Sequence, residues 1–127
     1  MASYIFKQDT RAERYRSHLY GRDLAISFMS VAELERWAQL KNWGIERLDA
    51  LRNYLDDFEL LLPDRDTCRI WAEITTDASK AGKSIGCADA WIAASALQNE
   101  LPLVSHDRKD FAFVNGLDLI FEPDSSH

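Results

Sequence analysis

The chain has 127 residues, of which 46% are hydrophobic and 28% charged, and its formal net charge is -6. These proportions are typical of one folded globular domain and exclude a largely disordered chain. The acidic balance argues against a general nucleic-acid coat, because nonspecific affinity comes from Lys and Arg that neutralise phosphates. No apolar signal segment or membrane-length apolar run is present, so we expect a cytoplasmic protein that does not contact a membrane. We expect one domain over residues 1–122 and a polar tail over residues 123–127.

Two local features of the sequence add to this overall composition, the two cysteines and a basic N-terminal segment. Cys68 and Cys87 are not spaced as a Cys-x-x-Cys pair and have no histidines at zinc-ligand spacing, so we expect reduced, buried thiols. Residues 1–22 contain five basic and two acidic side chains, a local charge of +3. This end of the chain can therefore attract a polyanion in spite of the net charge.

In chain order, the first predicted element is a helix over residues 4–20, closed by Gly21. A short apolar strand follows over residues 24–29. Ser30 is a good N-cap, and Glu33 three residues later completes a capping-box pattern, so a helix is expected from there to Gly44. A second helix over residues 45–57 folds back against it, and the two form a helical hairpin.

The second half of the chain continues the alternation of strands and helices. A strand over residues 58–62 ends at Pro63, and Asp64 or Asp66 can cap a helix that runs to Lys80. Residues 81–86 are a loop, residues 88–100 an alanine-rich helix, and residues 101–104 and 117–121 two further strands. This order predicts an α/β fold with a mainly parallel sheet and helices on both faces.

Three acidic residues, Glu33, Asp89 and Asp107, stand where apolar runs give way to helix starts or turns. Because parallel strands end at one edge of a sheet, acids placed there can converge on a divalent cation. Each acid also has a structural explanation. Glu33 completes a capping box, Asp89 suits the first turn of a helix, and Asp107 suits a turn or an N-cap. Spacing alone leaves both explanations open.

Three segments together make the chain resemble the PIN-domain family, in particular the VapC-like toxins of bacterial toxin–antitoxin pairs. They are Ile26-Ser27-Phe28-Met29-Ser30-Val31-Ala32-Glu33-Leu34, Asp89-Ala90-Trp91-Ile92-Ala93-Ala94 and Leu103-Val104-Ser105-His106-Asp107-Arg108-Lys109-Asp110-Phe111. The resemblance covers nearly the whole chain. It implies a three-layer α/β/α fold, and it gives Glu33, Asp89 and Asp107 the family's catalytic and metal-binding roles.

The N-terminus departs from the family pattern. The family begins with a central strand that ends in Asp-Thr-Asn, whose aspartate is a principal metal ligand, whereas this chain opens on Met1-Ala2-Ser3-Tyr4-Ile5-Phe6. The resemblance therefore implies that the first central strand is missing, through a start assigned downstream of the true one or a shortened gene product. Asp9 is rejected as a substitute, because the helix predicted from Tyr4 places it on the wrong side. We expect cation affinity to fall sharply without this ligand.

The resemblance implies a metal-dependent endoribonuclease that uses Mg²⁺ or Mn²⁺, cleaves single-stranded or loop RNA, forms a homodimer and is blocked by an antitoxin protein. The alternative is a catalytically dead PIN-like module that binds a protein or another copy of itself. A small-molecule phosphate site is disfavoured, because no Gly-x-Gly-x-x-Gly or Walker loop is present. Lys80 and Lys83 are candidate phosphate contacts, and Trp37, Trp43 and Trp71 suit either the core or a partner surface.

Overall fold

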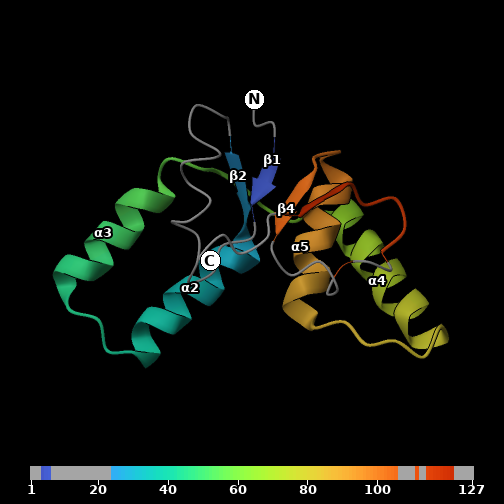
Figure 1. Ribbon diagram of the computed structural model, residues 1–127, viewed down its shortest axis with the longest axis horizontal. Coiled ribbons are helices and arrows are strands. Elements are labelled where there is room, and N and C mark those ends of the chain that lie inside the picture. Colours follow the sequence, from blue (N-terminus) through green and yellow to red (C-terminus); the bar gives the residue numbers. More distant parts are fainter. Residues whose placement is uncertain (1–3, 7–23, 106–110, 112–113, 122–127) are drawn as a thin grey trace.

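The computed structural model describes residues 4–6, 24–105, 111 and 114–121. The elements in these ranges are β1 (Tyr4–Phe6), β2 (Leu24–Ser27), α2 (Phe28–Leu40), α3 (Ile45–Leu55), β3 (Glu59–Leu61), α4 (Arg65–Lys80), α5 (Cys87–Gln98), β4 (Leu103–Ser105) and β5 (Leu119–Phe121). Figure 1 shows the hairpin of α2 and α3 on one side of the sheet's strands and the pair α4 and α5 on the other side of the view. The predicted alternation of strands and helices is confirmed.

The described strands form one sheet in the order β3-β2-β1-β4-β5, and all neighbouring strands are parallel. Winding proceeds outward from β1 to β3 and then restarts with β4 on the other side of β1. In such a sheet, ligands bind outside the carboxyl ends of the strands, at the point where the winding direction reverses. The topology therefore places a candidate site next to the ends of β1 and β4.

Strand β1 overturns two expectations. Residues 4–6 do not begin a helix, because Ile5 is paired with Ala25 of β2 on one side and Leu103 of β4 on the other. The expectation of a missing central strand is also wrong, since β1 occupies that position. An apolar, aromatic-rich tripeptide favours a strand when partners are available on both sides, and its pairing partners lie far along the chain. Residues 7–20 of the predicted helix lie outside the described residues.

The junction of β2 and α2 also differs from the prediction. The strand ends at Ser27, and the helix begins at Phe28 with Ser27 as its N-cap. The Ser27 hydroxyl accepts a hydrogen bond from the Met29 backbone N–H at 3.1 Å. Ser30, expected as the N-cap, lies inside the first turn and is 1% exposed. The earlier start lets Phe28 meet the Trp91 ring of α5, a contact between residues distant in the sequence.

The end of α2 was predicted too late, since the helix ends at Leu40 and not near Gly44. The remaining described elements match the prediction to within two residues at each end. Asp64 caps α4 as expected, since its carboxylate accepts the Thr67 N–H at 3.0 Å and the Thr67 hydroxyl accepts the Asp64 N–H at 3.0 Å. The predicted hairpin of α2 and α3 is confirmed, and Arg52 joins its helices by two hydrogen bonds of 3.0 Å to Glu35.

The core lies between α5 and the sheet. Most of the buried side chains of α5 are alanines, which lets the helix approach the strands closely. They pack with Ala25 and Leu103 of the sheet, and α4 packs on α5 through Ile74. Figure 1 shows α5 between β4 and α4.

The cysteines are free, as expected, but both are exposed, so the expectation of buried thiols is wrong. Cys68 follows the buried Thr67 on α4 and faces outward, and Cys87 is the first residue of α5. Hydrophobic side chains fill the α4–α5 interface without them. Within the described ranges, no helix combines the length and the hydrophobicity that a membrane crossing requires.

Candidate functional site

Helices α2 and α5 begin side by side at the carboxyl-terminal edge of the sheet. The ring of Phe28, in the first turn of α2, meets the edge of Trp91 in α5 at a centroid distance of 5.7 Å. Trp91 also stacks on Trp71 of α4 at 5.2 Å. This aromatic cluster fixes the relative position of the two helix starts. Sequence reasoning did not single out Trp91, although it lies within the run that begins at Asp89.

Asp89 lies in the first turn of α5, as predicted, and is half-buried. The N-cap, Gly86, offers no side-chain hydrogen bond to the helix. A Cβ atom added to Gly86 would lie 3.8 Å from Asp89 Oδ2, so this carboxylate oxygen lies close to the helix start. Asp89 therefore lies at the start of α5, on the helix whose start adjoins that of α2.

Glu33 lies on α2 and is exposed. Because the N-cap is Ser27, the predicted capping box between Ser30 and Glu33 is wrong, and this structural explanation for Glu33 is removed. The buried stripe of α2 comprises Ser30, Leu34 and Ala38. Glu33 borders that stripe, since it precedes Leu34 and lies one turn after Ser30. Its position suits a side chain at the margin between α2 and α5, which contact each other.

Asp107 lies outside the described residues, so its convergence with Asp89 and Glu33 stays a prediction. In the sequence it comes two positions after Ser105, the last residue of β4. No group of three His, Cys, Asp or Glu side chains suited to a metal ion occurs within the described part of the chain. Asp9 is likewise outside that part. The reason given for rejecting it, a helix from Tyr4, no longer holds because residues 4–6 form β1.

Two pKa shifts in the described part belong to structural contacts. The hydrogen bonds from Arg52 hold the pKa of Glu35 below its usual value, against a smaller opposing effect of burial. The Thr67 backbone N–H, followed by the Gln98 side chain, lowers the pKa of Asp64. The first contact joins the α2–α3 hairpin and the second joins α4 to α5, so neither identifies the candidate site.

The candidate phosphate contacts Lys80 and Lys83 are both exposed. Lys80 ends α4, and Lys83 lies in the turn before α5, three residues ahead of its N-cap. Gly82 between them has a φ of +69°, a left-handed conformation that glycine adopts without steric strain. Both ammonium groups thus belong to the segment that leads into the Asp89 turn.

The parallel sheet and the reversal of winding at β1 and β4 define a small α/β domain, and the acids on α2 and α5 are the described residues of its candidate site. Comparison with protein families identifies this domain. The family model described as PIN domain matches residues 1–117. The chain belongs to the PIN-domain family.

Known proteins support the same assignment. Ribonuclease VapC1 from Haemophilus influenzae (strain R2866) is 28% identical over 116 residues, covering 90% of this chain and 87% of the relative. The structure of VapBC-5 from Mycobacterium tuberculosis, a member of the VapBC family of toxin–antitoxin systems, matches with a TM-score of 0.71 at 27% identity, covering 97% and 99% of the two chains. VapBC2 from Rickettsia felis, bound to a DNA fragment from its promoter, matches with a TM-score of 0.80 at 20% identity, covering 94% and 98%. The PIN-like fold predicted from the sequence is confirmed.

Proposed function

We propose that this chain is a metal-dependent endoribonuclease of the VapC type, and that Asp89, Glu33 and Asp107 hold Mg²⁺ or Mn²⁺. The observation that carries the proposal is the contact of Phe28 with Trp91, which sets the starts of α2 and α5 side by side, with α2 beginning directly at the carboxyl end of β2. Family membership and the ribonuclease name of the Haemophilus relative support it. A cytoplasmic site of action belongs to the same proposal.

The donor set fits a hard cation, because carboxylate oxygens are the ligands that Mg²⁺ prefers in proteins. When bound, such an ion would neutralise charge on the phosphate and activate a water molecule for hydrolysis. The chain's own residues have separate tasks. Asp89 provides a carboxylate from the first turn of α5, and Glu33 adds a second from α2. Lys83 and Lys80 attract the phosphate backbone of RNA.

The test of this function is RNA cleavage by Asp89→Asn, which removes a charged ligand and keeps the shape of the side chain. We expect the parent to cleave single-stranded RNA with Mg²⁺ or Mn²⁺, and the variant to lose a factor of about 100 or more, because even an outer partner of a metal ligand is worth roughly 10–100-fold. Cleavage is followed on a gel with end-labelled RNA. Asp66→Asn, at an exposed acid in the first turn of α4, is the matched control and should cleave like the parent.

Equal cleavage by the parent and Asp89→Asn would refute the role of Asp89. A folded parent that leaves RNA intact with both metals would favour the second candidate, a catalytically dead PIN-like module that acts by binding a protein. The exposed apolar side chains of the α2–α3 hairpin, described next, are consistent with that candidate as well as with the nuclease, because they would serve protein binding and not hydrolysis.

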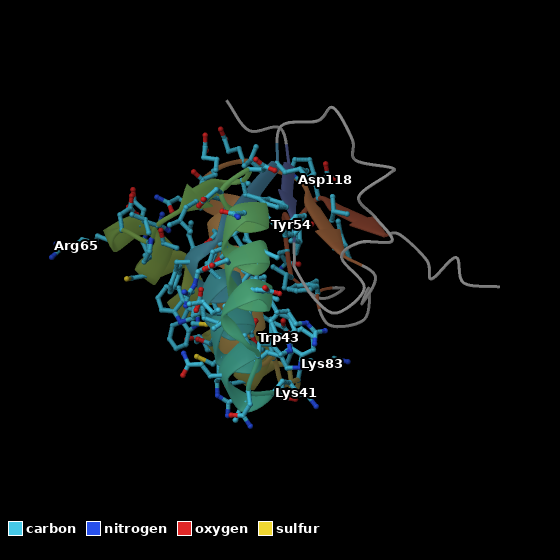
Figure 2. The ribbon with its side chains drawn as sticks, turned by 90° about the vertical axis from the view of Figure 1, so that its left-hand side faces the viewer. Lys41, Trp43, Tyr54, Arg65, Lys83 and Asp118 are labelled. Atoms are coloured by element: carbon cyan, nitrogen blue, oxygen red, sulfur yellow. The ribbon has the colours of Figure 1, made fainter. Side chains whose placement is uncertain are left out.

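We also propose that the partner is an antitoxin protein and that it contacts the turn of the α2–α3 hairpin. Two large apolar side chains there are solvent-exposed, Leu40 at 61% and Ile45 at 75%. Beside them Trp37 and Trp43 meet edge to face at 5.0 Å, with the Arg47 guanidinium 4.1 Å from the centroid of the Trp43 ring. Figure 2 shows Trp43 and Lys41 at one end of the hairpin, away from Tyr54.

Such a surface combines aromatic, apolar and arginine side chains, which are enriched in protein interfaces. The VapBC structures that this chain resembles support a protein partner, since one is described as a member of a family of toxin–antitoxin systems. Homodimerisation through the same or another surface, and a single domain ending near residue 122, remain parts of the proposal.

A further inference from the structure

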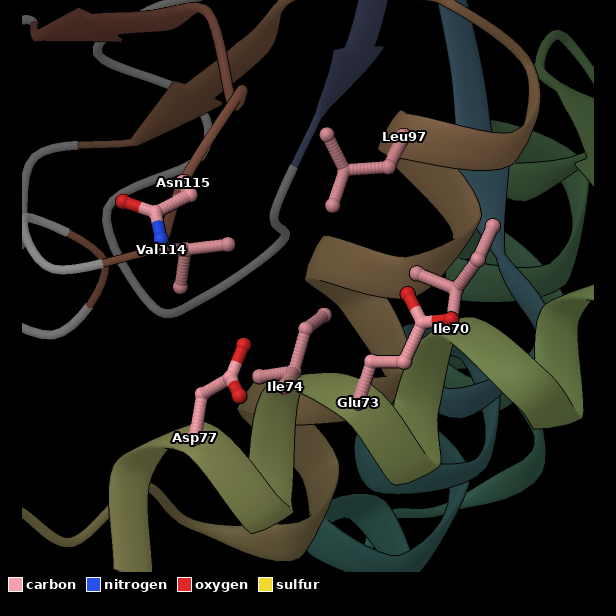
Figure 3. Close-up of a pocket in the computed structure, with 7 residues that line it drawn as sticks. All are labelled: Ile70, Glu73, Ile74, Asp77, Leu97, Val114 and Asn115. Carbon is pink, nitrogen blue, oxygen red and sulfur yellow. The ribbon is translucent and has the colours of Figure 1, made fainter. Parts of the chain in front are cut away.

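A pocket of about 140 Å³ lies between α4, α5 and the segment before β5, apart from the candidate nuclease site. Figure 3 shows its lining side chains, which converge from the three segments. They are Ile70, Glu73, Ile74 and Asp77 of α4, Leu97 of α5, and Val114 and Asn115. Neither Glu33 nor Asp89 contributes to it.

The pocket has an apolar floor and an acidic rim. Ile74 and Val114 are only 7% and 8% exposed, and the partly buried Ile70 and Leu97 pack against the same core. Glu73 and Asp77 are exposed and one helical turn apart, so their carboxylates lie on the same side of α4. Figure 3 shows both carboxylates directed toward the pocket, on either side of Ile74. Among the described residues that line the pocket, none is basic.

The two carboxylates differ in their neighbours. Glu73 accepts a hydrogen bond of 2.9 Å from Arg69, which shares its face of α4. The Asp77 carboxylate has no hydrogen-bond or ionic partner among the described residues. It also lies in the last turn of α4, where the negative end of the helix dipole disfavours a carboxylate and favours a cation. An incoming cation would therefore gain most at Asp77.

We propose that this pocket receives an arginine side chain of a separate, basic partner polypeptide. The three methylene groups of arginine would cover the apolar floor while the guanidinium stays at the rim, as long cationic side chains do on apolar surfaces. The guanidinium has five N–H donors in a planar fork. It can therefore donate to Asp77 and, at the same time, to either Glu73 or the Asn115 amide oxygen. A lysine ammonium has three donors on a single nitrogen, so it is less suited to acceptors that lie on different sides of the pocket. The net charge of the whole chain, -6, also favours a basic partner.

The experiment titrates the full chain, labelled at Ile, Leu and Val methyl groups, with N-acetyl-arginine N-methylamide and follows the methyl NMR signals. We expect saturable shifts at the methyl groups of Ile70, Ile74, Leu97 and Val114. The citrulline derivative, which has the same shape without the charge, should bind at least about fivefold more weakly, the usual net contribution of one hydrogen bond. Asp77→Asn should weaken the arginine probe similarly, and Asp66→Asn, on the same helix outside the pocket, should not.

Unshifted pocket methyl groups, equal binding of the arginine and citrulline probes, or full binding by Asp77→Asn would each overturn the proposal. Sedimentation velocity of the chain alone tests the alternative occupant, an arginine from a second copy of this chain. If Asp77→Asn lowers self-association, a second copy supplies the side chain, and a separate partner is wrong. All these readouts are independent of RNA cleavage, so failure here leaves the proposed nuclease function untouched, and failure of the nuclease leaves this pocket untouched.

Discussion

Ser27 and Ser30 are three residues apart on α2, but the position of the helix start gives them opposite roles. The Ser27 hydroxyl accepts the Met29 N–H and satisfies one of the free donors of the first turn. The Ser30 hydroxyl is buried without a hydrogen-bond partner among the described residues. A buried hydroxyl without a partner loses its hydrogen bonds to water on folding and forms none within the protein, which destabilises the folded state. The two serines should therefore respond differently to removal of the hydroxyl.

We predict that Ser27→Ala lowers the free energy of unfolding by about 1 kcal/mol, the usual value of an N-cap. Ser30→Ala should leave it unchanged or raise it by up to about 1 kcal/mol, because the variant no longer buries an unpaired hydroxyl. Urea unfolding followed by circular dichroism measures both. The reverse ranking, with Ser30→Ala the more damaging variant, would mean that the helix starts at Ser30 as its sequence pattern suggested.

At the scale of elements, one polar network joins the start of α4 to the end of α5. Asp64 accepts the Thr67 N–H through Oδ1 and the Gln98 amide at 2.7 Å through Oδ2. The Thr67 hydroxyl also donates to the Gln98 amide oxygen. Thr67 is fully buried, so the network links a helix cap to the packing between the two helices. The prediction of Asp64 as a cap was correct, and its bond to Gln98 was not foreseen.

This network makes stability depend on pH. The hydrogen bonds of Thr67 and then of Gln98 hold the pKa of Asp64 below its usual value. A carboxyl group with a lowered folded-state pKa stabilises the fold above its unfolded-state pKa, and this contribution is lost as the pH falls through the folded value. We predict that Asp64→Asn, which keeps an N-cap side chain, loses less stability than the parent on acidification below about pH 4.

The measurement compares urea midpoints of the parent and Asp64→Asn from pH 7 to pH 2. Gln98→Ala should reduce the acid dependence in the same direction, since it removes one of the bonds that lower the pKa. Asp66→Asn is the control, because its side chain takes no part in this network. Parallel curves for the parent and Asp64→Asn would show that the contact does not favour the ionised form.

At the scale of the molecule, two of the candidate acids, which are far apart in the sequence, lie on helices that contact each other. Glu33 lies on α2, which follows β2, Asp89 lies in the first turn of the helix before β4, and β1 lies between those two strands. Carboxylates that share a cation site, as proposed for these acids, repel each other while the site is empty, so a bound cation should stabilise the folded chain. The same topology leaves the acidic pocket of α4 at a separate location, where it can bind another chain without blocking the strand ends.

We predict that Mg²⁺ raises the free energy of unfolding of the parent, by about 2.7 kcal/mol when its concentration is a hundred times its Kd. Asp89→Asn should lose most of this gain, because it removes a charged ligand from the proposed site. Asp118→Asn, an exposed acid before β5, should retain it. Thermal unfolding at constant ionic strength measures the effect, since salt alone screens surface charges. An equal gain in Asp89→Asn would place the cation elsewhere.

The accuracy of the prediction followed the range of the interactions that form each element. Helix α4 was predicted closely, because its cap at Asp64 and its end at Lys80 depend on neighbouring residues. Strand β1 was missed, because its identity depends on pairing with Ala25 and Leu103. The start of α2 was misplaced for a similar reason, since Phe28 gains its contact from Trp91. Of the site residues, Asp89 was placed correctly in its helix, while the position of Asp107 is still untested.

The sequence by itself determined the alternation of helices and strands, the hairpin of α2 and α3, and the motifs by which the chain resembles PIN domains. These depend on local periodicity, caps and turn residues, which adjacent residues specify. Only the tertiary structure decided that Tyr4–Phe6 fills the centre of the sheet, that Cys68 and Cys87 are exposed, and that Glu73 and Asp77 border a pocket. Pairing, burial and cavities depend on residues distant in the chain, and a local pattern does not specify which distant segments meet.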